Sequence, residues 1–531
     1  MITLSIRRQI LPFYHCWANI FRGKATKPLD KRTAIQALNS LRIHEMPVEL
    51  KSTSYVTDLM QAYMRRMQIT DQDRDDMKII HVAGTKGKGS TCVFVESILQ
   101  KHGLKTGLLT SPHLVEVRER IRVNGKPISN EMFFKYFWEV SELLQVYDGN
   151  SELRKPNFVQ MLTAMAFYAF KHETVDVAVV ETSIGGAYDI TNVIDTPVCC
   201  GVTSLGIDHT EYLGSSLKEI AWHKSGIFKP GAPVFTVPQP EEAMSVLQQR
   251  AVDSGSELMV VPEFDLYPGA KKLNLGLAGS HQKYNASLAL QLTQCWLQRT
   301  SQQYVASALD SHTSQDIFPI NQTVQEALRA SRWEGRCHVI KFSSVTFYID
   351  GAHTEESLHC ATKWFKEETT KEKSALDSPC EKILMFNAST KRNFQKFLQI
   401  LFPCDFSQSI FVPNVATFSP MENLDQANVS IPIENQIFQV FRNRDAWREI
   451  CNSKNRPIPN DKSTAFLTVA DALSAVVGNR DVGDRNNLHS LRSTQEYTPM
   501  DFNGKHLQVL VTGSLHLVGS LLLILKNINT K

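Results

Sequence analysis

Short apolar runs alternate with longer amphipathic segments along this chain from about Met77 onward. The runs are rich in β-branched residues and predict buried strands, whereas apolar residues at helical spacing between them predict helices. In the first half we expect strands over residues 78–83, 104–109, 176–181 and 197–204, and helices over residues 34–43, 90–102 and 156–172. Strands that alternate with helices pair in parallel, so the pattern predicts an α/β sheet.

The rhythm restarts after a polar stretch at residues 311–316. Here we expect a hairpin over residues 337–350, helices over 354–368 and 393–401, strands over 382–386, 409–412 and 508–512, and surface loops over 369–381, 452–463 and 479–505. A chain of 531 residues is too long for one core. We therefore predict domains at residues 31–332 and 333–531, preceded by a tail of residues 1–30.

Composition narrows the class of protein. Hydrophobic residues make up 42% of the chain, charged residues 21%, and the net charge is +3, so a basic surface for nucleic acid is not indicated. The ten cysteines include no Cys-x-x-Cys pair, which suits a reducing compartment and argues against a disulfide framework or a zinc site. The most apolar stretch, residues 507–525, contains Thr, Gly, Ser and His and predicts a strand, turn and helix, not an integral membrane segment.

The first 29 residues contain Arg and Lys but no Asp or Glu. Their apolar residues can gather on one side of a helix, although Pro12 interrupts it. This pattern is typical of a mitochondrial transit peptide, and the alternative is a disordered basic arm. We expect a mitochondrial protein (in the matrix or associated with the inner membrane), a cytoplasmic one, or both.

A glycine-rich loop lies between the first predicted strand and the helix after it. Its residues are Gly84, Thr85, Lys86, Gly87, Lys88, Gly89 and Ser90. Backbone N–H groups and the helix N-terminus can surround a polyphosphate there, while Lys88 offsets its charge. The loop departs from the strict P-loop pattern at Val82 and at Gly89, and the alternative is an ordinary turn.

Polar residues with catalytic chemistry follow the later strands. Glu181 ends one strand and could bind Mg²⁺, His209 follows the next, and Lys224 lies beyond it. In the second half, Arg336 suits a nucleotide phosphate, and the Asp350-Gly351-Ala352-His353 segment is expected to project toward an interdomain cleft. A capping Glu, a structural His, a solvated Lys and a turn Asp are the respective alternatives.

Taken in order, several motifs resemble the folylpolyglutamate synthase family, a relative of the Mur peptide ligases. They are residues 84–90, Thr-Ser-Pro-His-Leu at 110–114, Arg-Glu-Arg-Ile-Arg-Val-Asn-Gly at 118–125, Asp-His-Thr at 208–210 and Asp-Gly-Ala-His at 350–353. The resemblance runs from about residue 34 to 523. It implies an N-terminal three-layer P-loop ATPase domain like the Mur ligase central domain, plus a smaller C-terminal Rossmann-like α/β domain, with the active site between them.

The resemblance implies a reaction and its substrates. ATP would phosphorylate the γ-carboxylate of a reduced folate, and L-glutamate would attack the resulting acyl phosphate. The implied catalytic residues are Lys88, Lys224 (as a carbamate) and His353; ATP would contact Gly84, Thr85, Lys86, Gly87, Lys88, Gly89, Ser90, Asn285, Arg336 and Asp350; Ser111, Glu181 and His209 would hold two Mg²⁺ ions; Thr110, Pro112, His113, His353 and Ser514 would face folate or glutamate. A monovalent cation such as K⁺ and a monomeric state are also expected.

Some residues depart from the family pattern, and two other functions stay open. Thr182-Ser183 replaces Val-Gly after Glu181, Glu334 replaces a common Pro, and Ser280 replaces a frequent Glu. Within the superfamily, a dihydrofolate synthase or a bifunctional enzyme is the alternative, although the long chain and the tail favour polyglutamylation. A nucleotide-binding regulator or kinase with the same loop would not need Ser111, His209 or Lys224.

Overall fold

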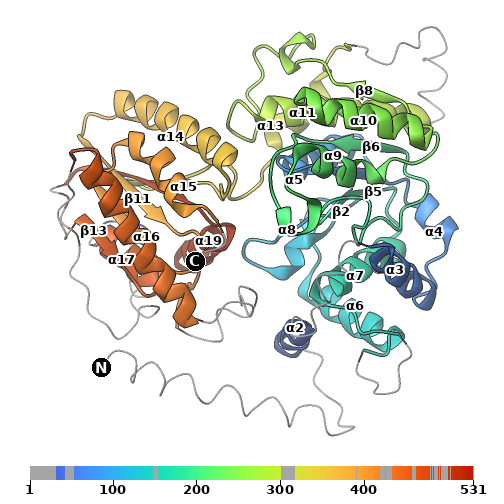
Figure 1. The fold of residues 1–531 in the computed structure, drawn as a ribbon, viewed down its shortest axis with the longest axis horizontal. Coiled ribbons are helices and arrows are strands. Elements are labelled where there is room, and N and C mark those ends of the chain that lie inside the picture. The colour runs from blue at the N-terminus through green and yellow to red at the C-terminus, as the bar shows by residue number, and fades with distance from the viewer. Residues whose placement is uncertain are drawn as a thin grey trace, which may run out of the picture.

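The computed structural model describes residues 31–41, 53–146, 153–300, 317–389, 392–418, 425, 433–456, 462–478, 480, 482, 488, 491, 500, 502 and 504–529. Our predictions for the tail 1–30, for residues 311–316, and for most of 479–505 lie outside these residues. Two sheets, each with its own helices, lie side by side (Figure 1). We call the part with the first sheet the N-terminal domain and the part with the second sheet the C-terminal domain.

The N-terminal sheet has eight strands in the order β4-β3-β2-β5-β1-β6-β7-β8. They are β1 (Ile80–Ala83), β2 (Thr106–Leu109), β3 (Ile121–Val123), β4 (Lys126–Pro127), β5 (Val177–Glu181), β6 (Cys199–Val202), β7 (Val234–Thr236) and β8 (Leu258–Val260). All pairs are parallel except β2–β3 and β3–β4. Val82 is paired with Glu181 and Ala83 with Val202, so the carboxyl ends of β5, β1 and β6 meet at one edge.

Helices cover both faces of this sheet, because alternate strand residues point to opposite sides. Val82 and Val179 pack with α5 (Lys88–Lys101), α11 (Gln282–Thr300) and α13 (Gln322–Ala330) on one face. On the other face, Val180 packs with α2 (Lys31–Ser40), α3 (Ser54–Arg66), α6 (Asn130–Leu143) and α7 (Phe158–His172), and Val202 packs with α9 (Leu217–Lys224) and α10 (Glu241–Ser254). Two short helices, α4 (Asp71–Asp76) and α8 (Thr210–Leu213), complete the domain.

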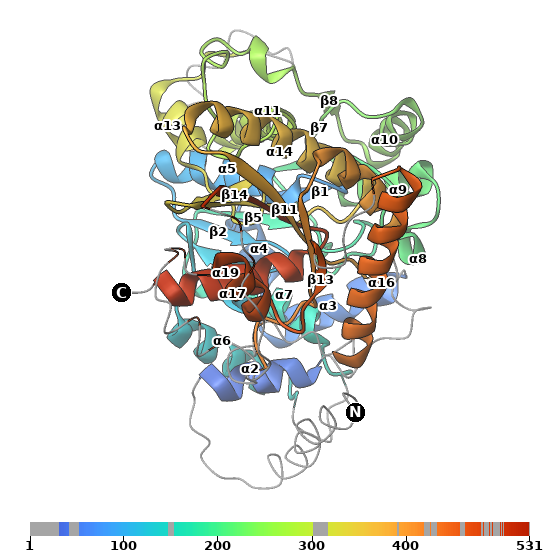
Figure 2. The ribbon, with the colours of Figure 1, turned by 90° about the vertical axis from the view of Figure 1, so that its left-hand side faces the viewer.

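The C-terminal sheet has six strands in the order β13-β12-β11-β14-β10-β9. They are β9 (His338–Lys341), β10 (Val345–Ile349), β11 (Cys380–Phe386), β12 (Gln408–Phe411), β13 (Ser463–Ala465) and β14 (His506–Thr512), parallel except for β9–β10. One face packs against α14 (Glu355–Ala375), α15 (Phe394–Leu401) and α16 (Ile433–Ser453), the other against α17 (Val469–Val477) and α19 (Leu515–Asn529). Figure 2 shows α14 and α16 on one side of the sheet and α17 and α19 on the other. The predicted fold class, two α/β domains, is confirmed.

One prediction was wrong: residues 369–381 are mostly not a loop. Helix α14 continues to Ala375 and β11 begins at Cys380. The reason is a buried polar cluster around Glu372, whose carboxylate accepts hydrogen bonds from Thr346 Oγ1 at 2.6 Å, Tyr348 Oη at 2.8 Å and Gln508 Nε2 at 2.9 Å. Polar composition indicated a surface loop. Most of the segment is indeed exposed, but Thr369 and Glu372 are buried, and the partners of Glu372 on β10 and β14 hold the last turns of α14 against the sheet.

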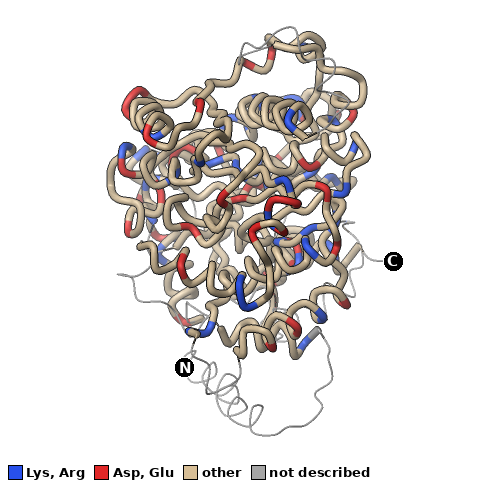
Figure 3. Tube along the Cα trace, turned by 90° about the vertical axis from the view of Figure 1, so that its right-hand side faces the viewer, with Lys and Arg blue, Asp and Glu red and all other residues tan. Residues whose placement is uncertain are grey.

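The predicted strand and helix near the C-terminus are confirmed as β14 and α19. Among the described residues, no helix is both long enough and apolar enough to cross a membrane. In the face that Figure 3 shows, Lys and Arg alternate with Asp and Glu along the trace. No single sign of charge dominates that face.

Candidate active site

The glycine-rich loop joins β1 to α5 at the carboxyl edge of the N-terminal sheet. Helix α5 begins at Lys88, two residues earlier than expected, and Gly87 precedes it with a φ of 92°. A Cβ on Gly87 would lie 2.2 Å from Asn285 Oδ1, and a Cβ on Gly84 would lie 1.8 Å from Thr203 Oγ1. Only glycine can adopt this left-handed backbone and also fit these close contacts. No side chain of Gly84 or Gly87 covers the N-terminus of α5, so its first N–H groups can face an anion.

Two lysines of the loop face the ends of the neighbouring strands. Lys88 Nζ donates to the Gly84 carbonyl at 3.0 Å and lies 3.8 Å from Glu181 Oε1. Lys86 Nζ donates to Asp208 Oδ2 at 2.9 Å. The loop therefore presents two cations beside its helix N-terminus, the arrangement that a polyphosphate requires.

Other loop residues are held by protein contacts. The Thr85 hydroxyl donates to the Gly206 carbonyl at 3.1 Å, so that side chain ties the loop to the segment after β6. Ser90 is buried, and its Oγ lies 3.5 Å from Gln282 Nε2 on α11. Asn285, on the same helix, donates from Nδ2 to Gln282 Oε1 at 2.9 Å. The structure places Asn285, which we expect to contact ATP, next to Gly87 of the loop, and it adds Gln282, which the sequence did not indicate.

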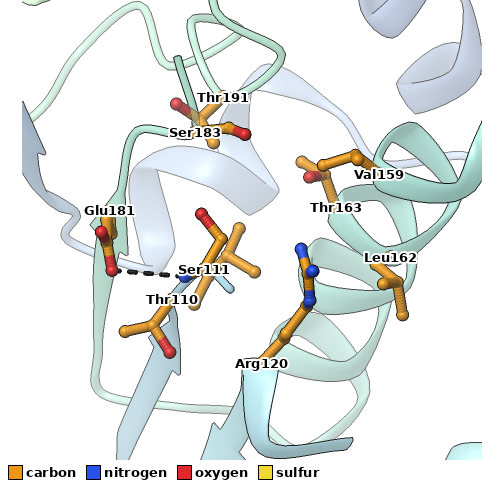
Figure 4. A pocket seen from close by; sticks show the side chains of 10 residues that line it. Thr110, Ser111, Arg120, Val159, Leu162, Thr163, Glu181, Ser183 and Thr191 are labelled. Carbon is orange, nitrogen blue, oxygen red and sulfur yellow. Dashed lines mark hydrogen bonds between the residues drawn. The ribbon is translucent and has the colours of Figure 1, made fainter. Parts of the chain in front are cut away.

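Glu181 ends β5 next to the segment that follows β2. Its Oε2 accepts from the Ser111 N–H at 3.3 Å (Figure 4). Burial raises the pKa of Glu181, and Lys88 opposes that rise. Glu181 and Ser111 lie on the wall of a small cavity of about 10 Å³, toward which Arg120 and Thr163 also project.

His209 and its neighbour Asp208 follow β6. His209 adopts a left-handed φ of 53° just before α8. Its pKa is lowered to about 4, chiefly by burial; Asp208 opposes this shift, and Lys88 and Lys224 contribute to it. The ring is therefore neutral at pH 7 and retains a lone pair on nitrogen for a metal.

Lys224 is the last residue of α9 and is 3% exposed. Its Nζ donates to the Gly84 carbonyl at 2.7 Å, the same oxygen that Lys88 contacts. Burial, followed by the nearby Lys88, lowers the pKa of Lys224 well below its usual range. The structure thus brings Lys224 to the phosphate loop with an amine that favours its neutral form.

Residues of the C-terminal domain face this loop. His353 Nδ1 pairs with the Gly351 carbonyl at 2.7 Å and Nε2 lies 3.3 Å from Lys86 Nζ. A carbonyl only accepts, so Nδ1 carries the proton and Nε2 accepts from Lys86. Burial, then Lys86, lowers the pKa of His353 to about 3.

The other expected C-terminal residues lie at the carboxyl edge of the C-terminal sheet or, like Arg336, in the linker between α13 and β9. Asp350 Oδ2 accepts from the Cys337 N–H at 2.7 Å, and Arg336 Nη1 donates to the Gly335 carbonyl at 3.1 Å. The Ser514 hydroxyl lies 3.5 Å from the Leu517 N–H at the start of α19. Asp350 and Ser514 follow the adjacent parallel strands β10 and β14, so they share one edge.

The segment after β2 bridges the domains. His113 accepts from Arg120 Nε at its Nδ1, at 2.9 Å, and donates from Nε2 to the Asp425 carbonyl at 2.9 Å. Leu114 packs in the C-terminal core. Thr110 and Pro112 line, together with Trp333 and Arg336, a cavity of about 340 Å³ between this segment and the linker. The imidazole of His113 thus holds the segment in place, a role that its sequence motif did not indicate.

Sequence reasoning missed one charged residue at the junction. Arg392 of the C-terminal domain donates to Asp208 Oδ1 at 2.6 Å. It follows β11 and precedes the Asn393 cap of α15, so the rule that ligands bind beyond carboxyl ends of strands could have identified it.

A phosphate loop in one domain, reached by side chains of a second α/β domain, is the layout of a two-domain ATP-dependent enzyme.

No protein-family model matches the chain. It is 36% identical to the mitochondrial folylpolyglutamate synthase of Cricetulus griseus, over 96% of this chain and 94% of that protein. It is also 36% identical to the human mitochondrial enzyme, over 94% and 92%. The Mycobacterium tuberculosis folylpolyglutamate synthase complexed with ADP and AMPPCP has the same fold, with a TM-score of 0.67 at 21% identity over 94% of this chain and 100% of that one. The chain belongs to the folylpolyglutamate synthase family of ATP-dependent ligases.

Proposed function

We propose that this chain adds L-glutamate to the γ-carboxylate of reduced folates in a reaction that converts ATP to ADP and phosphate. One observation carries the proposal. Lys88 and Lys224 donate to the same Gly84 carbonyl, at 3.0 and 2.7 Å, in a loop that His353 of the other domain approaches through Lys86. A cation at Lys88 offsets the charge of a transferring phosphoryl group, Lys224 lies beside it, and the second domain can deliver the amine to the same place.

The reaction we propose has two steps, because a carboxylate is a poor electrophile. An oxygen of the γ-carboxylate attacks the γ-phosphorus of ATP, the bond from that phosphorus to the bridging oxygen breaks, and ADP leaves. The amine of glutamate then attacks the acyl carbon, the carbon–oxygen bond to phosphate breaks, and the nitrogen loses its proton as phosphate leaves. Lys86 and Lys88 orient the phosphates, and His353 offers an unprotonated Nε2 near the amine.

Ser111, Glu181 and His209 are the residues that we propose hold Mg²⁺. A carboxylate, a hydroxyl and a neutral imidazole are suitable donors, and the backbone N–H of Ser111 lies 3.3 Å from Oε2 of the buried Glu181. The hydroxyl of Thr182, next to Glu181, is buried without a hydrogen-bond partner in the part of the chain described, which indicates further unmet polar capacity there. Within that part, no three His, Cys, Asp or Glu side chains form a metal cluster, so water and phosphate oxygens would complete the coordination. When bound, Mg²⁺ would offset phosphoryl charge.

We also propose that Lys224 is carbamylated. Burial and the nearby Lys88 lower the pKa of its amine well below the usual range, which supports the proposal, because CO₂ reacts with unprotonated amines. The carbamate would be an anion beside the metal residues. We further propose that the enzyme uses a monovalent cation such as K⁺, an expectation that comes from the family resemblance. Intact-mass measurement in bicarbonate, and activity with K⁺ replaced by Na⁺, test the two points.

The decisive experiment is a phosphate-release assay on the purified protein. With ATP, Mg²⁺ and tetrahydrofolate, we expect release that depends on L-glutamate and a product longer by one glutamate. Release with dihydropteroate alone would identify a dihydrofolate synthase, and release with both would identify a bifunctional enzyme. Phosphate release independent of glutamate would contradict the proposal in favour of another nucleotide-binding function.

The location and assembly of the protein are further proposals. Two relatives are named mitochondrial, and residues 1–30 are free of acid except Asp30, which supports import into mitochondria. Fusion of residues 1–30 to a fluorescent protein tests this, and a diffuse cytoplasmic signal would contradict it. Size-exclusion chromatography with light scattering tests the proposal that the protein is a monomer.

A further inference from the structure

The cavity of about 340 Å³ between the segment after β2 and the linker between α13 and β9 lies beside the phosphate loop. We call it the linker cavity. Thr110 lines both this cavity and the small one beside Glu181. Trp333 also lines it, and a Cβ on Gly89 of the loop would lie 3.2 Å from Trp333 Nε1 and 3.3 Å from Glu181 Oε2. The linker cavity therefore adjoins the place where the phosphoryl group would be transferred.

The wall of the linker cavity is rich in cations. Five of its side chains are Lys or Arg and three are Glu, so positive charges exceed negative ones by two. The cations are Arg118, Arg122, Arg332, Arg336 and Lys526. Such an excess of one sign in a concave site attracts ligands of the opposite charge. The cavity therefore suits an anion with more than one negative charge.

The three carboxylates of the wall are already engaged by the protein. Arg118 Nη2 lies 2.6 Å from Glu116 Oε2, and Lys526 Nζ lies 2.8 Å from Glu334 Oε2. The carboxylate of Glu119 accepts hydrogen bonds from three backbone N–H groups of the segment after β2. Two of the five cations are thus compensated within the wall itself.

The other cations differ in what they contact. Arg122 lies 3.3 Å from Glu96, which is buried behind the wall. Arg332 and Arg336 donate through Nη1 to nearby backbone carbonyls, and among the described residues neither forms an ion pair with a carboxylate. A guanidinium has five N–H donors in a fork that matches the two oxygens of a carboxylate. Since Arg336 is expected to contact ATP, Arg332 is the cation that a second ligand can use.

The folate in the proposed reaction is an anion whose length changes. Each cycle adds one γ-linked glutamate, so it leaves one more α-carboxylate and moves the pteroyl group further from the reacting γ-carboxylate. That reacting group must return to the same place beside Lys88 and Glu181, so the rest of the tail must extend away from it. The linker cavity begins there at Thr110, offers cations for the carboxylates, and has the half-buried Trp333 ring for the methylene groups between them.

We propose that the linker cavity binds the γ-glutamyl tail of folate polyglutamates, and that Arg332 pairs with an α-carboxylate of this tail. The inference rests on the proposed function and names the part of the enzyme that distinguishes a polyglutamate from a monoglutamate. Glu334 repels the tail and holds Lys526 in an ion pair. Arg332 and Glu334 therefore have opposite effects on the same substrate.

The test compares the KM for tetrahydrofolate, which has one glutamate, with the KM for its triglutamate. Glutamate-dependent phosphate release by the full chain is measured at saturating ATP and L-glutamate. For Arg332→Gln we expect the KM for the triglutamate to rise about 3- to 5-fold, because an ion pair at an exposed position is lost, and the KM for the monoglutamate to stay nearly constant. Arg329→Gln is the matched control, because Arg329 is exposed at the end of α13 and does not line the cavity.

Glu334→Gln should have the opposite effect. The substitution removes a carboxylate from the wall and releases Lys526 from its ion pair, so the KM for the triglutamate should fall about 3-fold. Added salt should raise the KM of the wild type for the triglutamate more than for the monoglutamate, because screening weakens attraction between exposed charges. This difference should be smaller in Arg332→Gln.

The outcomes separate the inference from the proposed function. Equal changes in the two KM values for Arg332→Gln, or no change in either, would overturn the inference, as would a KM for the triglutamate that is not lowered in Glu334→Gln. Absence of glutamate-dependent release in the wild type would instead refute the proposed function. Binding of AMPPCP, measured by calorimetry, confirms that each variant is folded; if Arg332→Gln fails this check, Glu334→Gln decides by its own KM criterion.

Discussion

Lys224 Nζ lies 2.7 Å from the carbonyl oxygen of Gly84, although 140 residues separate the two along the chain. The pair joins the end of α9 to the first residue of the phosphate loop. Lys88 donates to the same oxygen at 3.0 Å, so two lysines converge on one acceptor. Their mutual repulsion adds to the effect of burial and disfavours the charged form of Lys224.

Replacement of Lys224 should abolish most of the ligase activity. We expect Lys224→Ala to reduce glutamate-dependent phosphate release about 100-fold or more, because the variant lacks a group beside the transferring phosphoryl. Lys218→Ala, at an exposed position of the same helix, should retain wild-type rates. Steady-state assays with both variants make the comparison. Full ATP turnover by Lys224→Ala would favour a regulator or kinase over a ligase.

The carboxylate of Glu181 should set the requirement for magnesium. Glu181→Gln keeps the shape of the side chain but removes its charge, so we expect half-maximal activity at an Mg²⁺ concentration about 10-fold higher or more. The measurement is phosphate release against Mg²⁺ concentration. Glu257→Gln, at an exposed position before β8, is the control and should match the wild type. Identical Mg²⁺ curves for Glu181→Gln and the wild type would exclude Glu181 as a ligand.

Gly87 should be required for nucleotide binding. Alanine there would be strained at a φ of 92°, and its Cβ would also lie 2.2 Å from Asn285 Oδ1. We expect Gly87→Ala to bind AMPPCP about 10-fold more weakly, as calorimetry would measure. Gly103 has a φ of 84° and nothing within 4 Å of the added Cβ. Gly103→Ala should therefore lose about 1 kcal/mol of stability from strain and keep its affinity; equal affinities for both variants would contradict this account.

Glu96 should make stability depend on pH. The side chain is 2% exposed, and burial raises its pKa to about 7 although Arg122 lies 3.3 Å away and opposes the rise. Between the unfolded pKa, about 4.3, and pH 7 the native state binds a proton that the unfolded state has lost, so the free energy of unfolding falls as pH rises. By about pH 8 the cost is on the order of 3 kcal/mol.

Urea unfolding of Glu96→Gln and the wild type at pH 5 and pH 8 measures this effect. Since glutamine does not titrate, the stability of Glu96→Gln relative to the wild type should increase by about 3 kcal/mol between the two pH values. Glu242→Gln, at an exposed site in the first turn of α10, should show no such increase. A flat difference for Glu96→Gln would mean that the carboxylate is ionised throughout.

Local features of the site were predictable from the sequence, because they depend on neighbouring residues. Gly84, Gly87 and Lys88 lie between a run of β-branched residues and an amphipathic segment, and the structure places them at the junction of β1 and α5. The fold class was predictable for the same reason, since strands that alternate with helices pair in parallel. By contrast, the predicted end of the helix that became α14 was wrong, because the buried partners of Glu372 come from strands elsewhere in the chain.

By itself, then, the sequence determined the α/β class, the phosphate loop and, through the family resemblance, the reaction to be expected. The tertiary structure decided which distant groups meet. The pairing of Lys224 with Gly84 and of Arg392 with Asp208 depends on strand order, which places β5, β1 and β6 side by side in one sheet and β11, β14 and β10 in the other. Periodicity records only which face of an element is buried, whereas strand order results from long-range packing, so no local pattern could have indicated these pairs.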